Sequence, residues 1–162
     1  MRHDGSLYTL EVFIIDGPMT DKFRKKNRVV SRTIQIRGDQ TLRDLHRAIF
    51  EAVDREEEHL YEFEVGGKGP RDPKAKRYTL RSAAEDPFGM EEPAGDVSHT
   101  TIGSLDLKPK QAFGYWFDFG DDWRHQINVV AIEGQSPKDK YPKVTKRVGE
   151  SPPRYVDRDD EE

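Results

Sequence analysis

Acidic residues and a histidine are concentrated in one short stretch of the sequence, FDFGDDWRH. The candidates for catalysis within it are Asp118, Asp121, Asp122 and His125. Carboxylates and imidazoles are suitable ligands for divalent metal ions. One hypothesis is therefore a metal-dependent hydrolase or nuclease with a divalent metal as its cofactor, although the spacing matches no established hydrolase or metal motif.

A metal site at this stretch needs ligands from more than one segment of the chain. Its candidates are Asp122 and His125, with His46 from a predicted helix and His59 from a predicted strand. The competing interpretation is a polar β-turn whose acids bond to the amides of the turn. We favour the polar turn, and on that interpretation no metal or other cofactor is expected.

The pairing of the acids depends on the length of the turn. A three-residue loop at Gly120-Asp121-Asp122 places Asp118 opposite Arg124, as a cross-strand ion pair. A two-residue loop at Asp121-Asp122 places Asp118 opposite His125 instead. The sequence leaves both registers open.

The turn belongs to a predicted aromatic β-hairpin, Phe113–Glu133, around which the rest of the chain is arranged. Tyr115, Phe117 and Phe119 alternate with other residues, and such alternation makes one face of a sheet apolar. Trp116 has the opposite parity. It therefore faces either solvent or a cover on the second face of the sheet.

Hydrophobic periodicity predicts four further elements. They are strands at Leu7–Ile15, Val29–Ile36 and His59–Val65 and a helix at Leu42–Val53. Together they predict an α+β fold: a mixed or antiparallel sheet, one main helix packed across it, a first half in β-grasp order, and the long central hairpin. We expect a single domain over residues 1–156 with a long loop at 82–100, then a disordered acidic tail at 157–162.

A basic segment provides a second candidate surface. Residues 22–37 contain seven lysines and arginines and no acid, which suits contacts to the phosphates of a nucleic acid. The competing interpretation is a solvated surface whose lysines discourage edge-to-edge pairing of strands. The candidates for binding nucleic acid or a protein partner are Lys22, Arg24, Lys25, Lys26, Arg28, Arg32 and the aromatic Trp116.

Composition excludes several classes of site. The 162 residues include no cysteine, which excludes disulfides, thiolate zinc sites and cysteine nucleophiles. No run of 18 apolar residues is present, so we expect a cytoplasmic protein without a membrane partner. The net charge of −4 resides in the last six residues, and the neutral remainder argues against a dedicated nucleic-acid domain.

Three motifs occur in order along the chain. They are Gly38-Asp39-x-Thr41-Leu42-x-Asp44-Leu45-His46, His59-Leu60-Tyr61-x-Phe63 and Phe117-Asp118-Phe119-Gly120-Asp121-Asp122-Trp123-x-His125. Together they resemble the plasmid pRiA4b ORF-3-like family, which is met in bacteria and archaea, sometimes beside transposase genes. The resemblance covers Leu7 to Tyr155 and implies an α+β domain, but it supplies no accepted catalytic residues.

The chain departs from that family's pattern near its C-terminal end. Many members carry a cysteine-containing segment where Glu150–Tyr155 reads ESPPRY. Any metal or redox role tied to those cysteines is therefore absent from this protein.

We favour a non-enzymatic interaction or accessory module linked to plasmids or transposable elements, with a protein or a nucleic acid as partner. This hypothesis rests on the lack of a catalytic constellation and on the family resemblance. The alternatives are the metal-dependent hydrolase or nuclease and nucleic-acid binding through residues 22–37. The sequence leaves open whether the chain is an enzyme.

Overall fold

The structure is a computed structural model that describes residues 5–67, 74–80 and 94–153. Its helices are α1 (Asp21–Lys26), α2 (Leu42–Ala52) and a 3-10 turn, η1 (Gly103–Leu105). Eight strands lie within the described residues: β1 (Leu7–Asp16), β2 (Ser31–Arg37), β3 (Tyr61–Val65), β4 (Lys76–Thr79), β5 (Gly95–Asp96), β6 (Ala112–Phe117), β7 (Trp123–Glu133) and β8 (Lys143–Val148).

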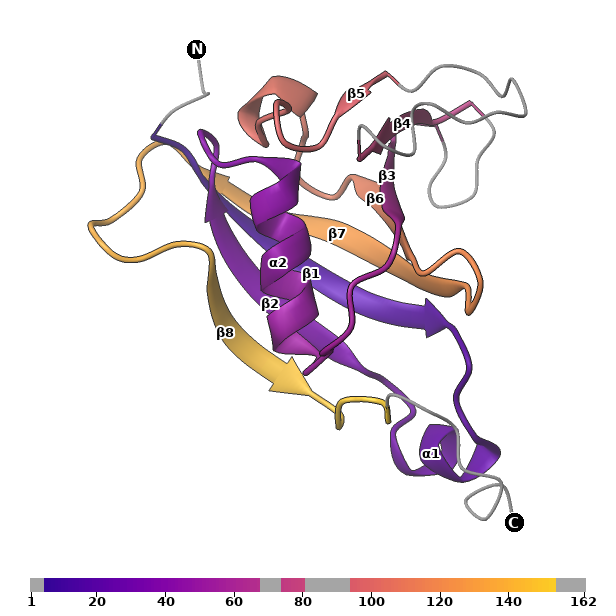
Figure 1. Cartoon of the computed structure of the whole chain (residues 1–162). Coiled ribbons are helices and arrows are strands. Elements are labelled where there is room, and N and C mark those ends of the chain that lie inside the picture. The colour runs from indigo at the N-terminus through magenta and orange to yellow at the C-terminus, as the bar shows by residue number, and fades with distance from the viewer. Residues whose placement is uncertain (1–4, 68–73, 81–93, 154–162) are drawn as a thin grey trace.

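These strands form one open sheet in the order β5-β4-β3-β6-β7-β1-β2-β8. Neighbouring strands are antiparallel except for β4 and β5. The longest helix among the described residues, α2, lies across one face of the sheet (Figure 1). The predicted α+β fold, a mixed sheet with one main helix, is therefore confirmed. Over the described ranges, no helix is both long and apolar enough to cross a membrane.

The main core lies between α2 and the sheet. Leu42, Leu45 and Ile49 recur on one side of α2 and are fully buried. A capping box fixes the start of the helix: the Thr41 hydroxyl accepts from the Asp44 amide (3.2 Å), and the Asp44 carboxylate accepts from the Thr41 amide (2.9 Å). The helix ends at Ala52, and the connection to β3 then runs towards the hairpin turn.

The β6–β7 hairpin has neither of the two predicted registers. Phe117 pairs with Trp123 and Trp116 with Arg124, so the loop comprises five residues, 118–122. Asp118 and Asp122 both adopt left-handed backbone conformations, with φ of 59° and 63°, which aspartate tolerates better than most residues. The Asp122 amide donates to the Asp118 carbonyl (2.6 Å) and closes the loop. Asp118 therefore pairs with neither Arg124 nor His125.

The longer loop also changes the position of one predicted core aromatic. Tyr115 and Phe117 lie in the core as expected. Phe119 is outside the strands, and its ring stacks on Trp116 at 4.1 Å between centroids. Trp116 lies on the second face of the sheet, half-buried, with the Arg124 guanidinium 4.1 Å from the centre of its ring.

Short elements also occur outside the predicted strands and helix. α1 lies in the basic connection between the first two strands, β5 lies inside the predicted 82–100 loop, and β8 follows the hairpin. Most of the predicted loop (82–93) and the predicted acidic tail (157–162) lie outside the described residues.

Candidate functional site

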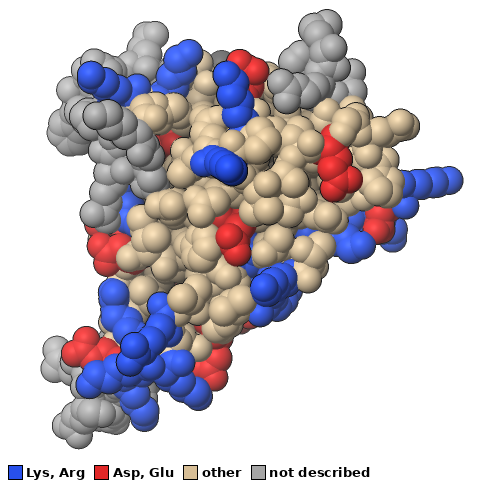
Figure 2. All heavy atoms as spheres, turned by 180° about the vertical axis from the view of Figure 1, so that it is seen from behind, with Lys and Arg blue, Asp and Glu red and all other residues tan. Residues whose placement is uncertain are grey.

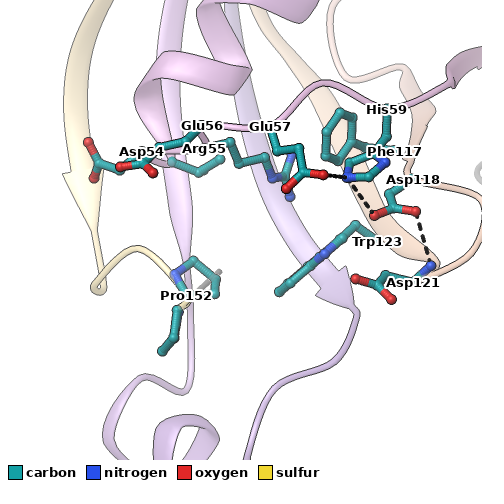
Figure 3. Close-up of a pocket in the computed structure, with 12 residues that line it drawn as sticks. Asp54, Arg55, Glu56, Glu57, His59, Phe117, Asp118, Asp121, Trp123 and Pro152 are labelled. Carbon is teal, nitrogen blue, oxygen red and sulfur yellow. Dashed lines mark hydrogen bonds and ion pairs between the residues drawn. The ribbon is translucent and has the colours of Figure 1, made fainter. Parts of the chain in front are cut away.

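A small pocket, with a cavity volume of about 50 Å³, lies beneath the hairpin turn and opens to solvent (Figure 3). The acids that line it are Asp54, Glu56 and Glu57 from the α2–β3 connection and Asp118 and Asp121 from the turn. The apolar walls are Val53, Phe117, Trp123, Pro152 and Pro153, and Arg55 and His59 complete the lining.

Asp118 holds the turn and contacts a histidine across the pocket. One of its carboxylate oxygens accepts from the Asp121 amide (3.2 Å), and the other lies 3.4 Å from His59 Nε2. The Asp118 amide donates to the Leu60 carbonyl (2.9 Å), which extends the β3–β6 pairing. Glu57 lies 3.8 Å from the same His59 nitrogen. The imidazole is thus between two carboxylates at the pocket rim, as Figure 3 shows.

Arg55 forms the inner wall of the pocket. Its guanidinium lies 4.5 Å from the centre of the Phe117 ring and 5.3 Å from that of Trp123. Its Nη2 atom donates to His125 Nε2 (2.9 Å), whereas the buried Nη1 atom has no hydrogen-bond partner in the part of the chain that the structure describes. Burial lowers the pKa of Arg55 to about 10, against the opposing effects of Tyr115 and Asp118. The side chain is a buried cation held mainly by aromatic rings.

His125 is part of the core and does not face the pocket. It is 1% exposed, and its Nδ1 atom lies 3.1 Å from the Tyr115 carbonyl. Because Arg55 donates to Nε2, the proton of the neutral ring resides on Nδ1 and is donated to that carbonyl. Burial, with the adjacent positive charge of Arg55, holds the pKa of His125 well below its usual value.

His46 is also buried, on the other side of Tyr115. Its Nδ1 atom lies 2.6 Å from the Tyr115 hydroxyl, and its Nε2 atom lies 2.9 Å from the Glu58 carboxylate. The ring stacks on Tyr61 at 3.7 Å, nearly parallel to it. Burial lowers the pKa of His46 to about 4, although Glu58 acts in the opposite direction. Both ring nitrogens of His46 and of His125 are therefore engaged inside the protein.

The structure brings together only some of the predicted site residues. Asp118, Asp121 and His59 share the pocket, whereas the Asp122 carboxylate turns away and pairs with Arg124 (2.9 Å). His46 and His125 lie in the core. Across residues 5–67, 74–80 and 94–153, no group of three or more histidines and acids is placed to hold a metal ion. Arg55 and Trp123 were not predicted as site residues, because their meeting depends on how the α2–β3 connection packs.

The predicted basic surface is divided by the fold. Arg32 is 3% exposed and donates to the carbonyls of Ala52 (2.8 Å) and Val148 (2.9 Å), so it supports the structure and is not available to a ligand. The other five basic candidates gather on and beside α1, at one corner of the molecule (Figure 2). Of these, Arg24 pairs with Asp16 and Lys26 with Glu150. The remaining three, Lys22, Lys25 and Arg28, have no ion pair within the described part of the chain.

The second face of the sheet holds a buried carboxyl that the sequence did not reveal. Glu62, in β3, is 1% exposed, and its Oε1 atom accepts from Nε (3.1 Å) and Nη2 (3.0 Å) of Arg77. Burial and a hydrogen bond to Glu64 raise the pKa of Glu62 to about 7, although Arg77 opposes the rise. The sequence predicted a strand at His59–Val65, and in the structure all of β3 is buried.

Comparison with known proteins decides the family. The family model described as plasmid pRiA4b ORF-3-like protein matches residues 22–158. This chain belongs to that family. The matched range contains all three motifs on which the resemblance was based, so that prediction is confirmed.

A solved structure supports the fold of this family member. The crystal structure of the protein of unknown function MM3350 from Methanosarcina mazei Go1 is 25% identical, with a TM-score of 0.63. The similarity covers 91% of this chain and 72% of that chain. A search of curated proteins gave no match. The comparisons therefore support family and fold, and the function has to be argued from the site.

Proposed function

We propose that this chain is a non-enzymatic interaction module of the cytoplasm, an accessory of a plasmid or mobile element, and that its pocket receives a basic side chain of a partner protein. The observation that carries the proposal is the convergence of acids from two segments on one pocket with apolar walls. The family's plasmid-derived name supports the link to mobile elements.

The charges of the pocket favour a cation. Five acids line it, against Arg55 and a histidine. Acids that face a confined space with apolar walls focus a negative potential there and attract a positively charged group. Asp121 is the most available of these acids, because its carboxylate makes no ion pair or hydrogen bond with any described side chain.

The shape of the pocket favours lysine or arginine over a small inorganic cation. The aliphatic stem of either side chain can lie along apolar surface while its charged end reaches polar groups. Here Pro152 and Pro153, the accessible apolar residues of the lining, supply that surface, and the acids line the same pocket (Figure 3). The guanidinium of Arg55 already covers the rings of Phe117 and Trp123, so the incoming charge is expected at the acidic rim.

The engaged histidines support a binding role over a catalytic one. Acid–base chemistry requires a titrating group that can reach a substrate. His46 and His125 are buried with both nitrogens engaged. His59 is accessible, and it shares the pocket with Asp118 and Asp121, which keeps the metal-dependent hydrolase as the second candidate.

A lysine-rich peptide is expected to bind at the pocket and to report through Trp123. In a Trp116→Phe background Trp123 is the only indole, so its fluorescence can be titrated with amidated pentalysine at low salt. Asp121→Asn is expected to weaken binding about threefold, the effect of losing one exposed charge pair. Glu133→Gln, an exposed acid at the far end of β7, is the matched control and should leave binding unchanged.

Three outcomes would overturn the proposal. The first is equal weakening by Asp121→Asn and Glu133→Gln, and the second is no response of Trp123 to the peptide. The third is Mn²⁺-dependent hydrolysis of bis-p-nitrophenyl phosphate that Asp118→Asn abolishes while the circular dichroism spectrum stays unchanged. That result would favour the hydrolase. Asparagine is the appropriate replacement because it tolerates the left-handed backbone of Asp118.

Nucleic-acid binding through the α1 corner is the third candidate, and it predicts a specific salt dependence. If Lys22, Lys25 and Arg28 contact phosphates of a duplex, the slope of log K against log salt should be about −3. The measurement is fluorescence anisotropy with a short labelled duplex over a range of salt concentrations. Lys22→Gln with Lys25→Gln should reduce the slope by about two. A slope that does not change in this double variant would exclude α1 as the contact surface.

A further inference from the structure

A second hollow lies beside α2, and its chemistry differs from that of the acidic pocket. It is a groove between the exposed side of α2 and the start of β3. Arg43, Arg47, Glu58, Leu60, Tyr61 and Leu80 line it, and His46 and His59 contribute to its walls. The acidic pocket takes its charge from the α2–β3 connection and the hairpin turn. The groove takes its charge from the helix.

The groove presents two arginines that no described residue neutralises. Arg43 and Arg47 are both exposed on α2, and neither forms an ion pair or side-chain hydrogen bond within residues 5–67, 74–80 and 94–153. Residues four apart on a helix are neighbours on its surface. The one acid among the lining residues, Glu58, bonds through both oxygens to His46 Nε2, at 2.9 and 3.3 Å. The positive charge of the groove therefore exceeds the negative charge.

A buried hydroxyl without a partner lies at the inner wall. Tyr61 is 2% exposed, and its hydroxyl has no hydrogen-bond partner among the described residues, which is a costly arrangement for a buried polar group. Burial and the nearby carboxylate of Glu58 raise the pKa of this hydroxyl, and Arg43 and Arg47 oppose the rise. Both guanidiniums are thus within electrostatic reach of the hydroxyl.

The remaining wall of the groove is apolar. Leu60 is 44% exposed, an unusual position for a large aliphatic side chain, and Leu80 is half-buried beside it. The Tyr61 ring is held flat against His46, so the groove has a fixed inner side. A ligand that pairs with the arginines, accepts from the Tyr61 hydroxyl and contacts the apolar wall carries an anionic group at one end and an apolar body at the other.

We propose that this groove binds a small phosphate monoester whose phosphate lies between Arg43 and Arg47 and accepts a hydrogen bond from the Tyr61 hydroxyl. The two charges of the phosphate match the two guanidiniums, and its three free oxygens can accept from two arginine forks and a hydroxyl at once. A carboxylate offers one charge and two oxygens. The apolar body of the ester lies on Leu60 and Leu80.

Phenyl phosphate is the probe for this site, and binding is followed by two-dimensional amide NMR of the whole chain. Phenyl phosphate is expected to bind more tightly than inorganic phosphate, because of the apolar wall, and more tightly than benzoate. Arg43→Gln with Arg47→Gln should weaken binding at least about tenfold, since two charge-assisted contacts are lost. Lys138→Gln with Lys140→Gln changes the net charge equally, at exposed positions in the β7–β8 connection, and should leave binding unchanged.

Tyr61→Phe separates a ligand contact from a structural role. The hydroxyl has no partner among the described residues of the free protein, so its removal should leave the melting temperature unchanged or raise it. The same variant is expected to weaken phenyl phosphate binding about fivefold, the effect of one hydrogen bond. Equal binding of benzoate and phenyl phosphate, equal weakening by the two double variants, or full affinity in Tyr61→Phe would each overturn the proposal. Because the groove and the acidic pocket have opposite charge, pentalysine binding is expected to survive the Arg43/Arg47 variant.

Discussion

Replacing Trp123 with alanine is expected to lower the free energy of unfolding by about 3–5 kcal/mol, the usual cost of removing a large buried aromatic. Trp123 is 6% exposed and forms one wall of the acidic pocket. Arg55 lies over its ring at 5.3 Å. Gly17 also packs against the ring, so closely that a Cβ atom there would lie 2.3 Å from Trp123 Cε3. The variant leaves a cavity that these neighbours cannot fill without moving the ends of β1 and the hairpin.

The measurement is urea denaturation followed by far-ultraviolet circular dichroism, which does not depend on the indole that is removed. Trp116→Ala is the matched control, because Trp116 lies on the neighbouring strand but is only half-buried. It is expected to cost less than half as much. Gly17→Ala tests the contact from the other side, and crowding of the ring together with the positive φ of Gly17 (155°) should cost at least about 1–3 kcal/mol. A loss in Trp116→Ala as large as that in Trp123→Ala would contradict this account.

The helix and the hairpin could be predicted because their signals are local. Leu42, Leu45 and Ile49 repeat at helical spacing, and the capping pair Thr41 and Asp44 begins the helix within the same few residues. Tyr115 and Phe117 alternate along one strand, and their side chains are buried as the pattern required. Such patterns depend only on the geometry of one element. These predictions therefore hold regardless of how the rest of the chain packs.

The register of the hairpin could not be predicted in the same way. Glycine is the usual residue for a positive φ, so the turn was expected at Gly120. The structure uses Asp118 and Asp122 instead, and each is stabilised within the turn by its own hydrogen bonds. The loop is two residues longer than the predicted three-residue loop. Phe119 therefore lies outside the core, and Asp118 lies away from its predicted partners.

The composition of the pocket depends on contacts between distant segments. His59 reaches Asp118 because the Leu60 carbonyl continues the ladder between β3 and β6. Arg55 reaches His125 only because the α2–β3 connection packs over the hairpin. No local pattern in the acidic run around Arg55 distinguishes a buried cation from a solvated one. Of the pocket lining, Asp118, Asp121 and His59 were among the candidates, and the residues whose place depends on tertiary packing were not.

Acidification from pH 6.5 to pH 4.5 is expected to destabilise the protein, because two histidines are buried in neutral form. The folded pKa of His46 is about 4, and that of His125 is also well below the ordinary value of 6.5. Below pH 6.5 the unfolded chain therefore binds more protons than the folded chain. The stability that these two neutral histidines contribute is fully present above pH 6.5 and is lost as the pH falls towards their folded pKa values.

Glu62 acts in the opposite direction over much of the same range. Its folded pKa is about 7, above the ordinary value of 4.5. The folded chain holds that proton where the unfolded chain has released it, so this contribution is present below pH 4.5 and is lost as the pH rises towards 7. Two histidines against one carboxyl leave a net loss on acidification of at most about 1.4 kcal/mol per pH unit.

Urea denaturation at pH 7, 6 and 5 measures this slope, and two variants separate its sources. Glu62→Gln removes the opposing group, so the loss of stability on acidification should become steeper. His125→Asn removes one of the two histidines and should make the loss shallower. His99→Gln removes an exposed histidine and is the matched control for that variant. Two results would contradict this explanation: a slope that becomes flatter in Glu62→Gln, or a slope that His99→Gln changes as much as His125→Asn does. Either would show that the loss of stability on acidification is not set by the buried histidines His46 and His125 and their partners Tyr115 and Arg55.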